Sequence, residues 1–259
     1  MIKCSKLLTS LCVILLVNLS ACGSDGSAVR VNLSALDSAE PALADYELLF
    51  IGNSHSSFNG LPHLVTMLIE ETELGKTAHA TLAPGADFLA ERLNDGKTQE
   101  TLETQKWTHV FLQAQKYSST GHFYYPTDAA QEWIRRIKTQ NAAPIMFPEW
   151  PRRGNTEEGQ RVYELHLSIT AREPACVAPV GPVWDAFIFR HPKIELHAAD
   201  GNHSNLNGAL LTAYVFYQIL TGKPANTLGY IAEIDVSQET QRKLKEVALD
   251  FHNLHLPCS

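Results

Sequence analysis

The chain has 259 residues, of which 44% are hydrophobic and 19% are charged, and its formal net charge at pH 7 is -7. This is the composition of a globular protein with enough apolar material for one large core. The negative charge argues against nucleic acid as a partner, because nucleic-acid binding depends on neutralising phosphates with lysine and arginine.

The N-terminal segment reads M-I-K-C-S-K-L-L-T-S-L-C-V-I-L-L-V-N-L-S-A-C. Two lysines precede an apolar run, Leu7 to Leu19, that is too short for a comfortable membrane span, and both features are typical of a secretory signal. The run leads into L-S-A-C, which resembles the lipobox of bacterial lipoproteins. That resemblance implies removal of residues 1–21, lipidation of Cys22 and a place in the cell envelope, anchored in the outer membrane.

The segment after the signal differs in composition from the rest of the chain. Residues 22–45 are small, polar and aperiodic, and we interpret them as a flexible tether to one domain at residues 46–259. Cys176 and Cys258 lie in this domain, and an oxidising compartment would allow them to pair, although two free thiols fit equally well. No C-x-x-C or H-x-x-x-H motif occurs, so the sequence gives no reason to expect a metal or another cofactor.

Short apolar runs alternate with helical patterns from Tyr46 onward. The expected strands are Glu47–Ile51, Lys76–Leu82, His109–Leu112, Pro144–Phe147 and Ala175–Ala178. The expected helices are Leu61–Glu73, Ala86–Asn94, Thr127–Gln140, Thr156–Arg172, Pro182–Phe189, Leu206–Leu220 and Ser237–His255. This alternation predicts an α/β domain of three layers, α/β/α, with a central parallel sheet covered on both faces. Active groups of such sheets gather on loops beyond the carboxyl ends of the strands.

A loop rich in glycine, asparagine and serine follows the first expected strand and reads G-N-S-H-S-S-F-N-G. It lacks the lysine of a P-loop, and it matches neither G-x-G-x-x-G nor the G-x-S-x-G elbow of lipases. The loop is therefore either a plain turn or a site that presents a nucleophile of another kind.

A second polar motif, D-G-N-H at Asp200–His203, precedes a late helix. A carboxylate three residues before an imidazole can reach the ring Nδ1 on a tight turn, which leaves the other nitrogen free to take a proton from a serine. The motif by itself is common by chance, and its position near the end of the domain gives it weight.

The two motifs together resemble the first and last blocks of the SGNH, or GDSL-type, hydrolase superfamily. I-G-N-S at Ile51–Ser54 matches the branch whose first block reads G-N-S, and A-P-G at Ala83–Gly85 matches the second block. V-F-L-Q-A-Q at Val110–Gln115 stands where the family usually has G-x-N-D, and it resembles a branch with L-Q-x-Q. The resemblance spans residues 46–222 and implies a flavodoxin-like SGNH fold.

The resemblance also implies roles for single residues. Ser54 would be the nucleophile, His203 the general base and then the general acid, and Asp200 the group that orients the imidazole. Ser56 and Ser57 compete for the place of the nucleophile but lie further from the strand end.

An oxyanion hole would combine the backbone N–H groups of Ser54 and Gly85 with one side-chain amide. Gln115 and Gln113 are the candidates for that amide, and counting from the strand end favours Gln115.

The predicted activity is that of a serine ester hydrolase that needs no cofactor and removes small acyl groups, such as acetyl, from a carbohydrate or similar carrier. Two alternatives stay open. The same serine could transfer acyl groups to an envelope glycan, or the chain could be a non-catalytic lipoprotein that binds a glycan or a partner on an SGNH scaffold. The sequence does not fix the oligomeric state.

Overall fold

Five short apolar segments pair into one sheet in the computed structural model, which describes residues 43–73 and 75–252. The strands are β1 (Tyr46–Ile51), β2 (Ala78–Leu82), β3 (His109–Leu112), β4 (Ala143–Met146) and β5 (Cys176–Val177). Their order is β2-β1-β3-β4-β5, and every neighbouring pair is parallel. This is the doubly wound order of flavodoxin-like sheets, so the predicted fold class is confirmed.

The central strands are apolar at nearly every position because both faces of the sheet are covered. In the register of β1 and β3, Phe50 lies beside Phe111 and Ile51 beside Leu112, and all four side chains are fully buried. The two phenylalanine rings stack with centroids 4.4 Å apart. This pairing aligns the carboxyl ends of β1 and β3, where the candidate site lies.

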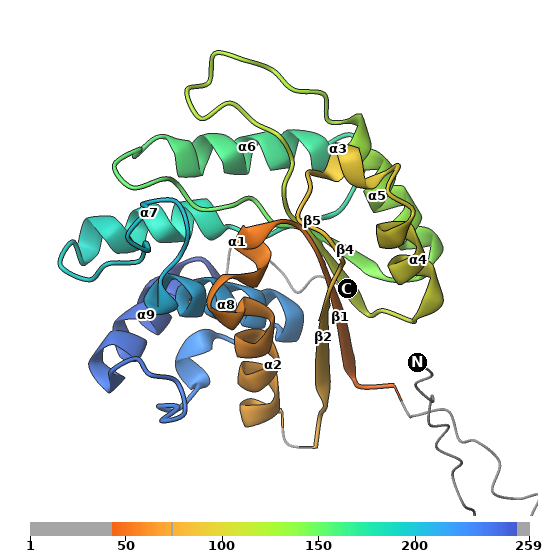
Figure 1. Ribbon diagram of the computed structural model, residues 1–259. Helices are drawn as coiled ribbons and strands as arrows, with labels where there is room; N and C mark the ends of the chain where they lie inside the picture. The colour runs from red at the N-terminus through yellow and green to blue at the C-terminus, as the bar shows by residue number, and fades with distance from the viewer. Residues whose placement is uncertain (1–42, 74, 253–259) are drawn as a thin grey trace, which may run out of the picture. The chain divides into compact units, whose positions relative to one another are not determined.

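The helices form two layers, one on each face of the sheet (Figure 1). On one face lie α2 (Leu61–Thr72), α7 (Val180–Arg190) and α8 (Leu206–Thr221), with α9 (Gln238–Asp250) packed against α7 and α8 in the same hydrophobic core. The other packs against α3 (Leu89–Arg92), α4 (Lys97–Thr104), α5 (Asp128–Thr139) and α6 (Glu158–Thr170). The remaining short elements are α1 (Ser54–Ser57), η2 (Phe58–Gly60) and η3 (Ala225–Thr227). Each face therefore has its own hydrophobic core.

The helix predictions differ from the structure mainly between β2 and β3. The expected helix Ala86–Asn94 is only the short α3, and α4 was not expected. The sequence of α4, K-T-Q-E-T-L-E-T, buries only Thr98 and Leu102, so it carries too little apolar periodicity to indicate a helix.

Several predictions fall on residues that the structure does not describe. The signal peptide, Cys22 and nearly all of the tether lie outside the described residues, as does Cys258. Cys176 is disulfide-bonded, and its pairing with Cys258 stays a prediction. In residues 43–73 and 75–252, no helix is both long enough and apolar enough to pass through a membrane.

Candidate active site

The loop after β1 turns directly into a helix that begins with Ser54. Asn53 caps this helix, because its side-chain oxygen accepts a hydrogen bond of 3.0 Å from the backbone N–H of His55. Gly52 leaves no room for a side chain, since a Cβ there would lie 2.1 Å from Ser56 Oγ. Ser54 is thereby fixed at the carboxyl end of β1, the edge of the sheet at which active groups were expected.

The D-G-N-H motif forms a tight turn ahead of α8. Asp200 Oδ1 accepts hydrogen bonds of 2.9 Å from the backbone N–H groups of both Asn202 and His203. Gly201, at φ +71°, supplies the left-handed conformation that the turn requires. Asp200 Oδ2 lies 2.6 Å from His203 Nδ1, so the carboxylate fixes both the loop and the ring.

The structure brings the two motifs together across 149 positions of the sequence. Ser54 Oγ lies 2.8 Å from His203 Nε2, on the nitrogen opposite the one that Asp200 holds. The hydrogen bond from the His203 ring, with those from the Asn202 and His203 backbone, holds the pKa of Asp200 well below its usual range. Asp200 therefore stays charged and stabilises the imidazolium that forms when His203 takes the serine proton.

Aromatic rings hold the His203 imidazole from the sides. The Phe58 ring stacks on it with centroids 4.4 Å apart, and the His55 ring lies at 5.1 Å. His55 is buried against Trp150, at 5.1 Å. The His55 ring therefore packs between Trp150 and the histidine that faces Ser54.

Two backbone donors lie on the loops that end β1 and β2. Within the described part of the chain, neither the Ser54 N–H nor the Gly85 N–H donates a hydrogen bond to another residue. Gly85 takes a left-handed conformation, φ +84°, on the loop after β2. Two free N–H groups on the loops that follow the paired strands β1 and β2 can stabilise an oxyanion that forms on a substrate carbonyl.

Comparisons with known proteins bear on the fold. No family model matches the sequence, and no curated protein matches it. A solved structure from Slackia heliotrinireducens, whose description names the SGNH hydrolases, is 24% identical. It aligns over 67% of this chain and 97% of its own, with a TM-score of 0.55. A DUF4886 family protein from Bacteroides uniformis is 15% identical, and the alignment covers 80% of this chain and 94% of that one, with a TM-score of 0.60.

This chain has the fold of the SGNH hydrolases. The fold that the sequence motifs implied is confirmed, and the identities are low enough that the similarity shows the fold alone. The chemistry must therefore be argued from the residues of the site.

The two glutamines at the end of β3 have different surroundings in this SGNH fold. Gln113 Oε1 accepts hydrogen bonds from the Asn53 N–H (2.8 Å) and the Ser56 hydroxyl (3.2 Å). The Gln115 amide instead donates to the carbonyls of Lys116 (2.9 Å) and Pro126 (3.1 Å). Both amide hydrogens of Gln115 are therefore committed, whereas Gln113 faces the nucleophile loop with its oxygen, which accepts hydrogen bonds and cannot stabilise an oxyanion. Gln113 thus supports the nucleophile loop, and which glutamine completes the oxyanion hole stays a prediction.

Glu149 is a site residue to which the sequence assigned no role. It follows β4, and its Oε2 accepts a 2.6 Å hydrogen bond from Gln113 Nε2. It also lies 3.8 Å from His55 Nδ1. In the sequence, only its position after a strand could have placed Glu149 at this edge of the sheet. Because Gln113 Nε2 donates to Glu149, the oxygen of the Gln113 amide is the atom that faces the nucleophile loop.

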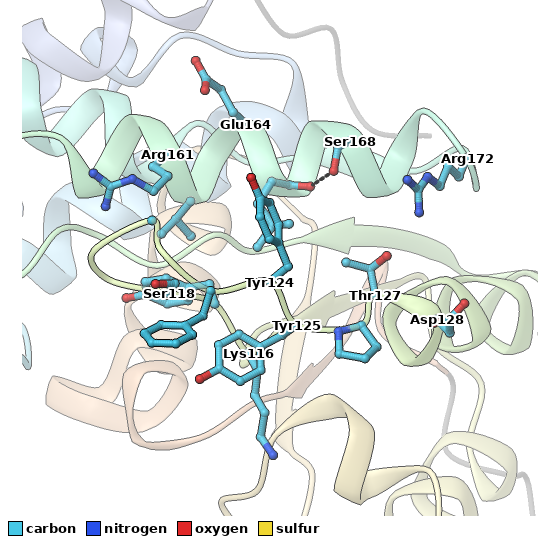
Figure 2. Close-up of a pocket in the computed structure, with 16 residues that line it drawn as sticks. Lys116, Ser118, Tyr124, Tyr125, Thr127, Asp128, Arg161, Glu164, Ser168 and Arg172 are labelled. Atoms are coloured by element: carbon cyan, nitrogen blue, oxygen red, sulfur yellow. Dashed lines mark hydrogen bonds between the residues drawn. The ribbon is translucent and has the colours of Figure 1, made fainter.

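A cavity of about 620 Å³ lies between the segment that follows Gln115 and α6 (Figure 2). The lining includes three consecutive aromatic residues, Phe123, Tyr124 and Tyr125, which are 69%, 98% and 44% exposed. Tyr124 extends toward α6, and arginines stand at both ends of that helix face (Figure 2). In the described ranges, no group of three or more acidic, histidine or cysteine side chains is placed to hold a metal ion.

Proposed function

We propose that this protein is a serine esterase of the cell envelope that removes small acyl groups, acetyl above all, from a carbohydrate or similar carrier. The observation that carries the esterase proposal is the chain of hydrogen bonds from Ser54 Oγ through His203 to Asp200, at 2.8 Å and 2.6 Å. Each of these groups has the orientation that nucleophilic acyl transfer requires.

The reaction follows from the positions of these groups. Ser54 Oγ attacks the ester carbonyl while His203 Nε2 takes its proton, and the Ser54 and Gly85 N–H groups stabilise the oxyanion. The intermediate collapses when His203 returns the proton to the departing alkoxide, which leaves an acyl-serine. Water then attacks the acyl group with His203 again as the base, and the acid is released as the serine is restored.

Replacing the proposed nucleophile tests the assignment. Ser54→Ala should lower kcat on p-nitrophenyl acetate by about a millionfold and abolish labelling by a fluorophosphonate probe. Ser57→Ala is the matched control: this serine lies on the same helix and is exposed, and its hydroxyl donates to the Ser54 carbonyl, at 3.3 Å. It should keep both activity and labelling. Wild-type turnover in purified Ser54→Ala would refute the nucleophile.

The carbohydrate carrier is supported by the aromatic cavity after β3. Exposed aromatic side chains grouped in one concave site indicate ligand binding, and their faces pack well against sugar rings. Tyr124→Ala should raise KM for an acetylated oligosaccharide about tenfold and leave the kinetics of p-nitrophenyl acetate unchanged. Phe189→Ala removes another exposed aromatic side chain, 87% exposed on α7, and should change neither. Equal effects of the two substitutions on KM for the acetylated oligosaccharide would contradict carbohydrate binding in this cavity.

The proposed location depends on Cys22, in the L-S-A-C motif. Lipid chains on this residue would anchor the domain through the tether, with about 0.8 kcal/mol for each buried methylene. Cys22→Ser should move the protein from the detergent phase to the aqueous phase in a partitioning experiment. Unchanged partitioning would refute lipidation.

A further inference from the structure

Arg92, the last residue of α3, is fully buried. Among the described residues it forms no salt bridge, although a buried charge without a partner is strongly unfavourable. Hydrogen bonds must therefore satisfy the guanidinium, and the identity of their acceptors shows what the residue holds together.

All the acceptors of Arg92 lie close to the oxyanion donors or on the helix that follows α3. Nη2 donates to the carbonyls of Gly52 (2.5 Å) and Gly85 (2.9 Å). Nη1 donates to the Pro84 carbonyl and the Thr98 hydroxyl, both at 2.8 Å. Nε donates to the Asp87 carbonyl at 3.1 Å. These contacts account for the full set of five N–H donors of the guanidinium.

The bond to Pro84 acts directly on a proposed oxyanion donor. The Pro84 carbonyl and the Gly85 N–H belong to one peptide unit, and in a planar trans peptide they point in opposite directions. Holding the carbonyl on the guanidinium therefore directs the Gly85 N–H away from Arg92. The positive charge also polarises this peptide and makes its N–H a stronger donor.

The bond to Gly52 acts on the nucleophile loop in the same way. The Gly52 carbonyl shares a peptide with the Asn53 N–H, and that N–H donates to Gln113 Oε1. The peptide just before the one that carries the Ser54 N–H is thus held at both ends, by Arg92 and by Gln113. One rigid, planar side chain joins the loops after β1 and β2.

We propose that Arg92 is a positioning residue that sets the distance and direction between the Ser54 and Gly85 N–H groups. The proposal rests on the proposed function, since it presupposes that these groups bind an oxyanion. Arg92 touches no reacting atom, and its effect passes through the two peptides that it holds. A displacement of about 1 Å in such a site costs about a hundredfold in rate.

The decisive variant is Arg92→Lys, which keeps the charge but loses the planar fork. It should lower kcat on p-nitrophenyl acetate about a hundredfold with KM changed less than twofold. It should also weaken binding of a boronic acid, a tetrahedral analogue, by a similar factor. The control is Leu102→Ala, a buried residue of α4 in the hydrophobic core on the same face of the sheet. This control should lower the melting temperature while leaving kcat of the folded enzyme within twofold.

A loss of kcat in Arg92→Lys no larger than that in Leu102→Ala would overturn the proposal. If Arg92→Lys does not fold, Thr98→Val decides, because it removes one acceptor of Nη1. That variant should lose about tenfold in kcat at constant KM, and wild-type kcat would overturn the proposal. Turnover by Ser54→Ala would refute the proposed function itself. If Ser54→Ala is inactive and Arg92→Lys is fully active, only the role of Arg92 is refuted.

Discussion

The two halves of the candidate site are built in different ways. The half that moves protons, Asp200 and His203, lies near solvent, with side chains 48% and 21% exposed. The half that supports the oxyanion donors consists of Gln113 and Arg92, and both residues are fully buried. The first half is held by bonds between residues two or three positions apart, whereas the bonds of the second include two that span 40 and 60 positions.

This difference matches what each half does in the proposed mechanism. The imidazole must exchange protons with substrate and water, so its loop can be short, local and accessible. The oxyanion donors stabilise charge only if they are already fixed in direction when the charge appears. Long-range buried hydrogen bonds provide that fixed direction, and they couple the donors to the stability of the fold.

The exposed half gives the largest expected effect on rate with little effect on stability. Asp200→Ala should lower kcat about ten-thousandfold, because His203 loses the carboxylate that orients it. The melting temperature should stay near that of the wild type, since the bonds lost are local and close to solvent. Glu195→Ala removes a neighbouring exposed acid that pairs with Arg153 and should leave kcat unchanged. A large fall in the melting temperature of Asp200→Ala would contradict the claim that this half of the site contributes little to stability.

The buried half should respond in both rate and stability, and the two glutamines test this as a matched pair. Gln113→Met should lower kcat about a hundred- to a thousandfold, since its loss frees the nucleophile loop. It should also lower the free energy of unfolding by about 1–3 kcal/mol, because the partly buried Asn53 N–H loses its acceptor. Gln115→Met should keep kcat within a few-fold, because its amide holds only loop carbonyls. Steady-state kinetics and urea unfolding check both. The reverse ranking in kcat would support Gln115 as the oxyanion donor, as the sequence favours.

Asp185 on α7 tests whether burial of a polar group by itself affects catalysis. Burial, with a smaller contribution from the nearby Glu158, raises the pKa of its carboxyl from 3.8 to about 7. The folded state therefore holds this proton more tightly than the unfolded state. This group makes the free energy of unfolding fall as pH rises from about 4 to about 7, with no further change above that.

Asp185→Asn should remove this pH-dependent loss of stability. The variant should be more stable than the wild type by about 1 kcal/mol at pH 8, a value reduced for partial exposure, and should show no such gain at pH 4. The kcat on p-nitrophenyl acetate should not change. Urea midpoints at the two pH values measure the effect, and an equal change at both would refute the raised pKa.

The sequence by itself predicted the parallel sheet and named the residues that form the hydrogen-bonded chain. The strands are short, continuous apolar runs, and Asp200 and His203 meet through a turn that four consecutive residues encode. Such signals are local, so they can be read along the chain. The weakly apolar α4 gave no such signal and was missed.

Only the tertiary structure decided which polar side chains support the nucleophile loop. Gln113 and Gln115 differ in the sequence only by their distance from the end of β3, which does not show which partners they have. In the structure, Gln113 bonds to the Asn53 N–H and Gln115 to the Pro126 carbonyl. Arg92 carries no motif at all, and its role depends on two loops that meet only when β1 and β2 pair. The physical reason is that a buried hydrogen bond is specified by the direction of both partners, and direction across 40 or 60 residues is a property of the packed chain.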